Sequence, residues 1–162
     1  MLVDRAANAH LSRNILNSGH IPMPDLKLLA LDSEDLDVIS ATTQDAVVRV
    51  GDMGYAKGDH RFALLMNRFA WEEGGKTRQR KRAALHFDRV NDVKVSGIDT
   101  NSIEGVLELL AIRFSVTDDP AGHVDLDFAG GGTIRLTVEC LEARLQDLGA
   151  AWAARATPEH IA

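Results

Sequence analysis

The sequence predicts an α+β fold: a bent, mostly antiparallel β-barrel or half-barrel, preceded by a strand and a helix and followed by a helix. Apolar and polar residues alternate over much of 48–138, which is the period of half-buried strands. The connections between these stretches are short, as is usual for antiparallel neighbours. Apolar residues at helical spacing flank this region on both sides.

One domain is expected in a chain of 162 residues, since a fold of this size buries roughly 70% of its unfolded surface. Residues 1–22 carry Asn, His, Ser and Gly with only scattered Leu and Ile. We expect them to be a disordered tail or an extension upstream of the natural start, because they cannot bury enough apolar surface to offset ordering. The globular domain is then 23–155, followed by a C-terminal tail at 156–162.

A strand and a helix open the predicted domain. The apolar residues within 26–31 predict the strand. Asp32 or Ser33 follows as the helix N-cap, with carboxylates in the first turn, where they meet the positive end of the helix dipole. Three- and four-residue apolar spacing continues the helix to about Ala46.

Two irregularities are predicted in the first long strands. The alternation slips around Gly51, as expected of a bulge or a sharp bend. The inward phase of 62–66 then moves to Phe69 and Trp71, which predicts a second irregularity near Asn67. Two bent strands in succession favour a curved sheet.

The last hairpin has inward positions on both strands, at Val124, Leu126 and Phe128 and at Ile134, Leu136 and Val138. A two-residue turn would set Asp127 against Ile134 and bury a charge. A three-residue loop of 130–132 pairs Phe128 with Ile134 and sets Asp127 opposite Arg135 on the wet face. We therefore predict the three-residue loop.

A terminal helix is predicted from the stripe formed by Leu141, Leu145 and Leu148, with Gly149 as its C-cap. Such a helix would cover the open end of the bent sheet. This order of elements is similar to a pleckstrin-homology-like barrel with an added N-terminal strand and helix, a likeness of fold that says little about activity.

The stretch 70–77 raises the question of a phosphate-binding loop, because it reads AWEEGGKT. A phosphate loop requires a buried parallel strand before it and a helix after it. Here the preceding segment is expected to pair antiparallel, and the following residues soon alternate as a strand. We interpret 72–82 as a long, flexible hairpin connection instead.

A cluster of cations lies in this connection: Lys76, Arg78, Arg80, Lys81 and Arg82. Such a run on an acidic protein can be a solvated loop, a contact for a polyanion, or a contact for an acidic protein surface. The run itself contains no aromatic residue for base stacking, which weakens the prediction of single-strand recognition.

Other chemistry-bearing residues are sparse. His123, Asp125 and Asp127 share one face of a strand and have the spacing of metal ligands, or they are simply its outer face. His86 and Asp88 repeat this arrangement once. Cys140, as the single cysteine, is either a packing residue or a thiol activated by a helix N-terminus. No metal and no cofactor are expected, and the protein is not expected to be an enzyme.

The net charge of −6 and the pI near 5.4 argue against general attraction to nucleic acid or to anionic lipid. No apolar run approaches the roughly 18 residues of a membrane span. No export signal is expected, since Asp4 and Arg5 fall where its apolar segment would begin, and one cysteine cannot form an internal disulfide. A cytoplasmic location is the expectation.

Several strings together resemble the alphaproteobacterial domain-of-unknown-function family 2948: LKLLALDSEDLDVISA, QDAVVRVGD, HRFALLMNRFAWE, RAALHFDRV, LLAIRF and FAGGGTIRLTVECLEARLQDLGAAWAAR. The resemblance covers roughly 25–155 and leaves 1–22 outside, which makes Met23 an alternative start. It implies a single-domain cytoplasmic protein, and it supplies no catalytic residue, substrate or partner.

Three functions remain open at this point. The leading one is a non-catalytic binding or adaptor module with a protein partner. The first alternative is an RNA- or anion-binding protein that uses the basic stretch 76–82. The second is a metal- or thiol-dependent enzyme that uses the His123 group or Cys140. Exposed sheet edges also allow a homodimer.

Overall fold

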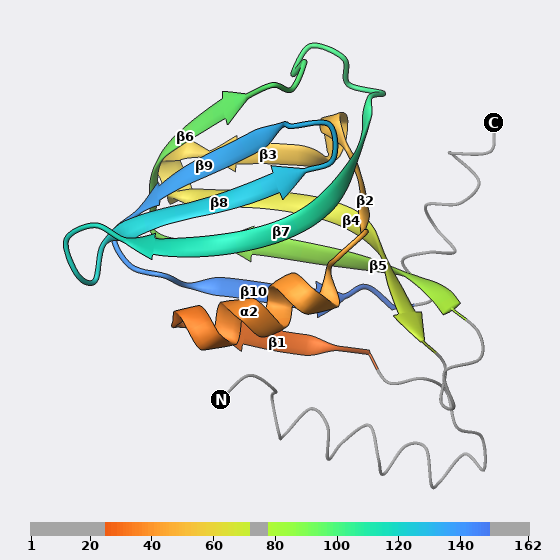
Figure 1. Ribbon diagram of the computed structural model, residues 1–162, viewed down its shortest axis with the longest axis horizontal. Helices are drawn as coiled ribbons and strands as arrows, with labels where there is room; N and C mark the ends of the chain where they lie inside the picture. Colours follow the sequence, from red (N-terminus) through yellow and green to blue (C-terminus); the bar gives the residue numbers. More distant parts are fainter. Residues whose placement is uncertain (1–24, 72–77, 150–162) are drawn as a thin grey trace, which may run out of the picture.

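The computed structural model describes residues 25–71 and 78–149, which form a ten-stranded sheet and one α-helix (Figure 1). The elements, in chain order, are β1 (Lys27–Ala30), α2 (Ser33–Thr42), β2 (Val47–Arg49), η1 (Val50–Asp52), β3 (Met53–Ala56), η2 (Lys57–Asp59), β4 (Arg61–Trp71), β5 (Arg78–Phe87), β6 (Val90–Ser96), β7 (Val106–Val116), β8 (Gly122–Phe128), β9 (Thr133–Val138) and β10 (Ala143–Asp147).

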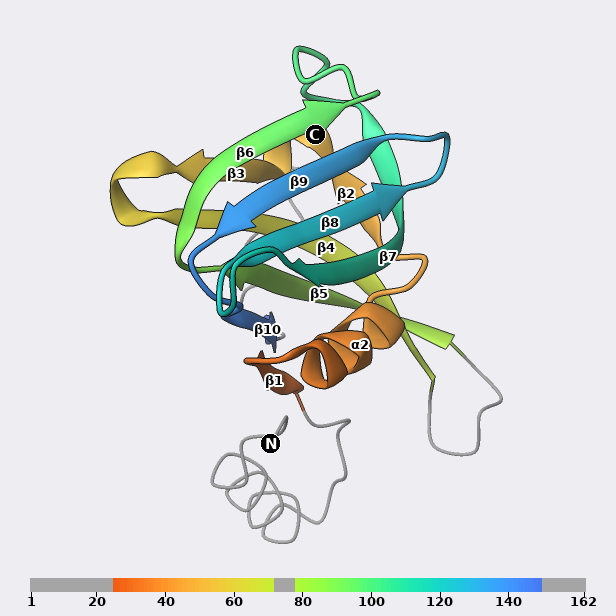
Figure 2. The same ribbon diagram turned by 60° about the vertical axis from the view of Figure 1, so that its left-hand side comes forward.

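The strands lie in the order β1-β10-β5-β4-β2-β7-β8-β9-β6, and β3 adds to β4. Every neighbouring pair is antiparallel, which confirms the predicted sheet type. The sheet bends strongly, but its edge strands β1 and β6 do not pair, so it remains open (Figure 2). The core lies inside this bend, and its largest fully buried side chains include Phe87, Phe128, Leu36, Ile39, Leu64 and Leu126.

The helix α2 begins as predicted. Its N-cap is Asp32, whose side chain accepts a hydrogen bond of 2.8 Å from the backbone N–H of Asp35. The helix buries Leu36 and Ile39 against β7 and β1 (Figures 1 and 2). Ser40 Oγ also accepts from the backbone N–H of Ile112 in β7, at 2.9 Å. This N-terminal helix therefore covers the inside of the bend near one edge of the sheet.

The predicted terminal helix is wrong for the described residues, because Ala143–Asp147 form β10, between β1 and β5. Leu141 and Leu145 are four residues apart, and a spacing of four fits the period of a strand as well as that of a helix. The intervening Ala143 is fully buried, as strand alternation requires. Asp147 also faces the core, and this charged inward position hid the strand pattern.

The irregularity predicted near Asn67 is also wrong. β4 pairs with β5 without interruption from Phe62 to Trp71, and Arg68 occupies the inward position where an apolar residue was expected. Arg68 forms a bidentate ion pair with Asp147, in which Nε and Nη2 of the guanidinium each donate a hydrogen bond of 2.8 Å to a different carboxylate oxygen. The bend predicted at Gly51 is confirmed, since the 3-10 turn η1 lies there between β2 and β3.

The register of the β8–β9 hairpin differs from the predicted one by two residues. Leu126 pairs with Ile134, and Asp125 rather than Asp127 lies opposite Arg135. Since Gly132 O accepts from the N–H of Phe128, the three-residue loop is 129–131 instead of 130–132. A two-residue shift keeps every side chain on its face, so the inward residues were correct although the partners were not.

Among the described residues, no helix has the length and apolarity that a membrane crossing requires. The tails predicted at 1–22 and 156–162 lie outside the described residues.

Candidate binding face on β5 and its neighbours

The predicted basic residues lie mainly on a strand. Arg78 begins β5 opposite Trp71, and Arg80, Lys81 and Arg82 continue that strand, so the expected connection is wrong from residue 78 onward. Lys76 lies outside the described residues. The chain after the AWEEGGKT stretch is an antiparallel strand and not a helix, which confirms the context that argues against a phosphate loop.

Strand alternation divides the basic run between two faces of the sheet. Arg80 and Arg82 are opposite Phe69 and Asn67 on the outer face. Lys81 faces the inner side, where its ammonium group is 4.0 Å from the carboxylate of Asp25. The run therefore does not form one cluster. Among its described residues, Arg80 and Arg82 are on the outer face, which a partner could approach from the solvent.

Arg80 is exposed and lies over the ring of Phe69, with 5.3 Å between the guanidinium carbon and the ring centroid. This distance is within the range of a cation–π contact. The aromatic residue missing from the basic run is thus supplied by the neighbouring strand β4. The contact restrains the Arg80 side chain and so reduces the side-chain entropy that a partner would have to remove.

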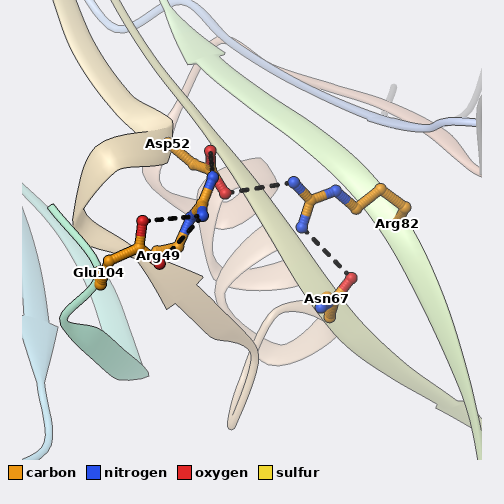
Figure 3. Close-up of polar contacts among 5 residues, drawn as sticks. All are labelled: Arg49, Asp52, Asn67, Arg82 and Glu104. Atoms are coloured by element: carbon orange, nitrogen blue, oxygen red, sulfur yellow. Dashed lines mark hydrogen bonds and ion pairs between the residues drawn. The ribbon is translucent and has the colours of Figure 1, made fainter. Parts of the chain in front are cut away.

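Arg82 belongs to a network on the same outer face (Figure 3). Its guanidinium is 3.2 Å from Asp52 Oδ2 and 3.4 Å from Asn67 Oδ1. Arg49 contacts the other oxygen of Asp52 at 3.1 Å and Glu104 at 3.3 Å. Burial acts to raise the pKa of Asp52, but the hydrogen bonds from the two arginines outweigh it and lower that pKa.

Two cations from distant parts of the chain join this face. Arg144 in β10 is opposite His86 of β5, and Lys27 in β1 is opposite Gln146 of β10, all on the outer side. Lys27, Arg80 and Arg144 are exposed and form no salt bridge with the described residues. We call Lys27, Arg80, Arg82 and Arg144 the basic face. It spans three adjacent strands, about 10 Å across and 20 Å along the sheet.

The metal site considered at His123, Asp125 and Asp127 is not assembled. The carboxylate of Asp125 accepts two hydrogen bonds from Arg135, at 2.8 and 3.0 Å. Asp127 contacts Arg113 at 2.8 Å. Within the described residues, no group of three or more His, Cys, Asp or Glu side chains is arranged to hold a metal ion.

Replacing Asp125 by Asn should remove part of the acid sensitivity of the fold. The hydrogen bond from Arg135 lowers the pKa of Asp125. A carboxyl group with a lowered folded pKa stabilises the protein above its unfolded pKa, and this contribution disappears as the pH falls through the folded value. Urea denaturation should show a loss of about 1–3 kcal/mol for Asp125→Asn at pH 7. The difference from the parent protein should shrink below pH 3.8. A gap that stays constant with pH would contradict this.

Cys140 is partly exposed and lies in the connection between β9 and β10. The argument for an activated thiol required it to begin a helix, and the structure places no helix there. Cys140 is therefore left without the helix N-terminus that was invoked for its reactivity.

Comparison with curated proteins and with solved structures finds no match to this chain. One protein-family model matches residues 26–160, which is most of the chain and agrees closely with the range of the resemblance. That family is described as a protein of unknown function, so it assigns no role to the basic face. The chain belongs to the DUF2948 family.

Proposed function

We propose that the protein is a non-catalytic binding module that holds an acidic segment of a partner protein on the basic face. The observation that carries the proposal is the exposed Arg80, ordered over Phe69, together with Lys27 and Arg144 on the same side. These cations stand out on a chain whose net charge is −6. A local positive surface of this kind steers and orients a negatively charged partner.

The network around Arg82 supports the same function. Asp52 contacts both Arg49 and Arg82, so the Arg82 side chain is already held on the basic face before a partner binds. Ordered arginine side chains favour binding because less side-chain entropy is lost. The cations at the margins, Lys27 and Arg80, keep their charge available to carboxylates of a partner.

Single-stranded RNA is the second candidate partner, and the contact between Arg80 and Phe69 favours it. Aromatic rings and guanidinium planes both offer stacking surfaces for unpaired bases, while neighbouring cations contact the phosphates. The acidic protein partner remains our first choice because, among the described residues, the basic face pairs one exposed arginine with one half-buried aromatic ring and does not present a row of aromatic residues along a basic groove.

The proposal is tested by titrating the protein with a polyglutamate peptide and, separately, with single-stranded oligouridylate. We expect polyglutamate to bind, and the affinity to fall as salt rises. The double variant Lys27→Ser/Arg80→Ser should bind polyglutamate roughly two- to thirtyfold more weakly, since each exposed ion pair contributes about 0.2–1 kcal/mol. Calorimetry or fluorescence anisotropy measures both affinities.

The matched control is Lys57→Ser/Lys94→Ser, which removes the same charge from exposed positions outside the basic face. It should bind polyglutamate almost as the parent protein does. Equal losses in the two double variants would show an effect of net charge alone and contradict the proposed face. Binding of oligouridylate without binding of polyglutamate would favour the RNA candidate instead.

A further inference from the structure

A polar pocket of about 620 Å³ lies where the ends of β4, β5 and β10 meet the β9–β10 connection. We call it the corner pocket. Its lining includes His86, Asp88, Arg61, Arg144, Glu139 and Glu142. Its volume is in the range of small-molecule sites. Its walls are mostly charged, so a ligand of this pocket has to carry charge as well.

Part of this charge is already paired within the protein. Arg61 is 2.7 Å from a carboxylate oxygen of Asp88, and Arg89 is 3.9 Å from one of Glu142. Arg144 and Glu139 line the same pocket, are exposed, and form no salt bridge with any described residue. Asp59 also lines the pocket, is exposed and forms no salt bridge with any described residue. The pocket therefore retains one open cation, Arg144, and two open carboxylates, Glu139 and Asp59, so that both signs of charge are available to a ligand.

One residue that lines the pocket, His86, has a polar atom that the fold does not satisfy. His86 Nε2 is buried without a hydrogen-bond partner, and its nearest charged neighbour, Asp88 Oδ2, is 3.6 Å away. A buried polar atom without a partner destabilises the fold. Burial lowers the pKa of His86, although Asp88 acts in the opposite direction. The uncharged form of the His86 ring is therefore favoured.

Two residues at the pocket have left-handed backbone conformations although they are not glycine. These are His60, with φ of 53°, and Arg89, with φ of 62°. Such conformations are energetically unfavourable for residues other than glycine and are concentrated at functional sites. The lining of the corner pocket thus combines two unfavourable backbone conformations with an unpaired buried nitrogen.

We propose that the corner pocket binds a small zwitterion of the amino-acid or dipeptide class, with its carboxylate on Arg144 and its ammonium group on Glu139. A ligand with a single charge would pair with only one of these two side chains. The other side chain would then carry the same sign of charge as the ligand and repel it. The two internal ion pairs stay intact, since neither Arg144 nor Glu139 takes part in them. This site shares Arg144 with the basic face, but its second contact, Glu139, lies outside that face, and its test uses a different ligand.

The test is a calorimetric titration of the full chain with glycylglycine, and with sodium acetate and methylammonium chloride as single-charge probes at the same ionic strength. We expect glycylglycine to bind, and each single-charge probe to bind at least about tenfold more weakly. The variants Arg144→Gln and Glu139→Gln should each weaken glycylglycine about tenfold or more. Both positions are exposed, so both variants should fold.

The matched control is Arg80→Gln, an exposed arginine on the same strand as His86 but outside the pocket, which should leave glycylglycine binding unchanged. In NMR spectra of the parent protein, glycylglycine should shift the ring signals of His86. Absence of glycylglycine binding at millimolar concentration would overturn the proposal, as would acetate binding equally well. Equal weakening in Arg80→Gln would also overturn it, because the effect would not come from the pocket.

Discussion

Replacing Asp147 by alanine is expected to lower the free energy of unfolding by about 3–5 kcal/mol, because it leaves a buried guanidinium without its counter-charge. Asp147 accepts two hydrogen bonds of 2.8 Å from Arg68 and one of 3.0 Å from the backbone N–H of Leu26. Its side chain has no exposed surface, and that of Arg68 is 8% exposed. The substitution therefore removes contacts of β10 both with β4 and with the segment before β1.

Urea denaturation at pH 7 measures this loss, with Asp25→Ala as the matched control. The carboxylate of Asp25 is half-exposed and 4.0 Å from Lys81, so its removal should cost at most about 1 kcal/mol. The double variant Arg68→Met/Asp147→Leu should recover part of the stability, since it removes both buried charges together. A loss below about 1 kcal/mol for Asp147→Ala would contradict the importance of this ion pair.

A second large effect is expected for Gly122→Ala, which should destabilise the protein by about 3 kcal/mol or more. A Cβ atom at Gly122 would overlap the backbone oxygen of Ser115 and lie 2.7 Å from the ring of Phe114. Gly122 is in β8, paired with Val116 on one side and Val138 on the other, so the backbone has little freedom to retreat. The strain is relieved only by moving β7 or its aromatic ring.

The matched control for this change is Gly54→Ala in β3. A Cβ atom there would meet nothing within 4 Å, so stability should stay the same or rise by up to about 1 kcal/mol through the unfolded chain. Thermal and urea denaturation of the two variants compare the same chemical change in two surroundings. If both variants unfold like the parent protein, the close packing at Gly122 does not limit stability.

The fold was predictable where inward positions are apolar. Residues Leu36 and Ile39 fixed the buried side of α2, and the apolar alternation of β8 and β9 fixed the faces of the last hairpin. Two of the errors, the terminal helix and the irregularity near Asn67, come from one pair, Arg68 and Asp147, which place charge at inward positions. A rule that assigns charge to the outside cannot recognise a buried pair whose partners are far apart in the sequence.

The candidate face was only partly predictable. The basic run showed that Arg80 and Arg82 were of interest, but its interpretation as a loop hid the alternation that separates them from Lys81. Arg144 could not be assigned to the face from the sequence, because its segment was predicted to be a helix. Lys27 could not be assigned to it because the neighbour of β1 in the sheet was unknown. The residues that line the corner pocket come from several loops and strands. They have no regular spacing in the sequence that could have grouped them.

The position of β10 between β1 and β5 has a consequence for the order of events during synthesis. The first strand made has no place in the sheet until the last strand is present, because β10 is its described neighbour. The pairing of β1 must therefore wait until the ribosome has passed Asp147. Contacts between such distant segments slow folding. A nascent chain that stops before Ala143 would leave the edge of β5 bare and Arg68 without its carboxylate.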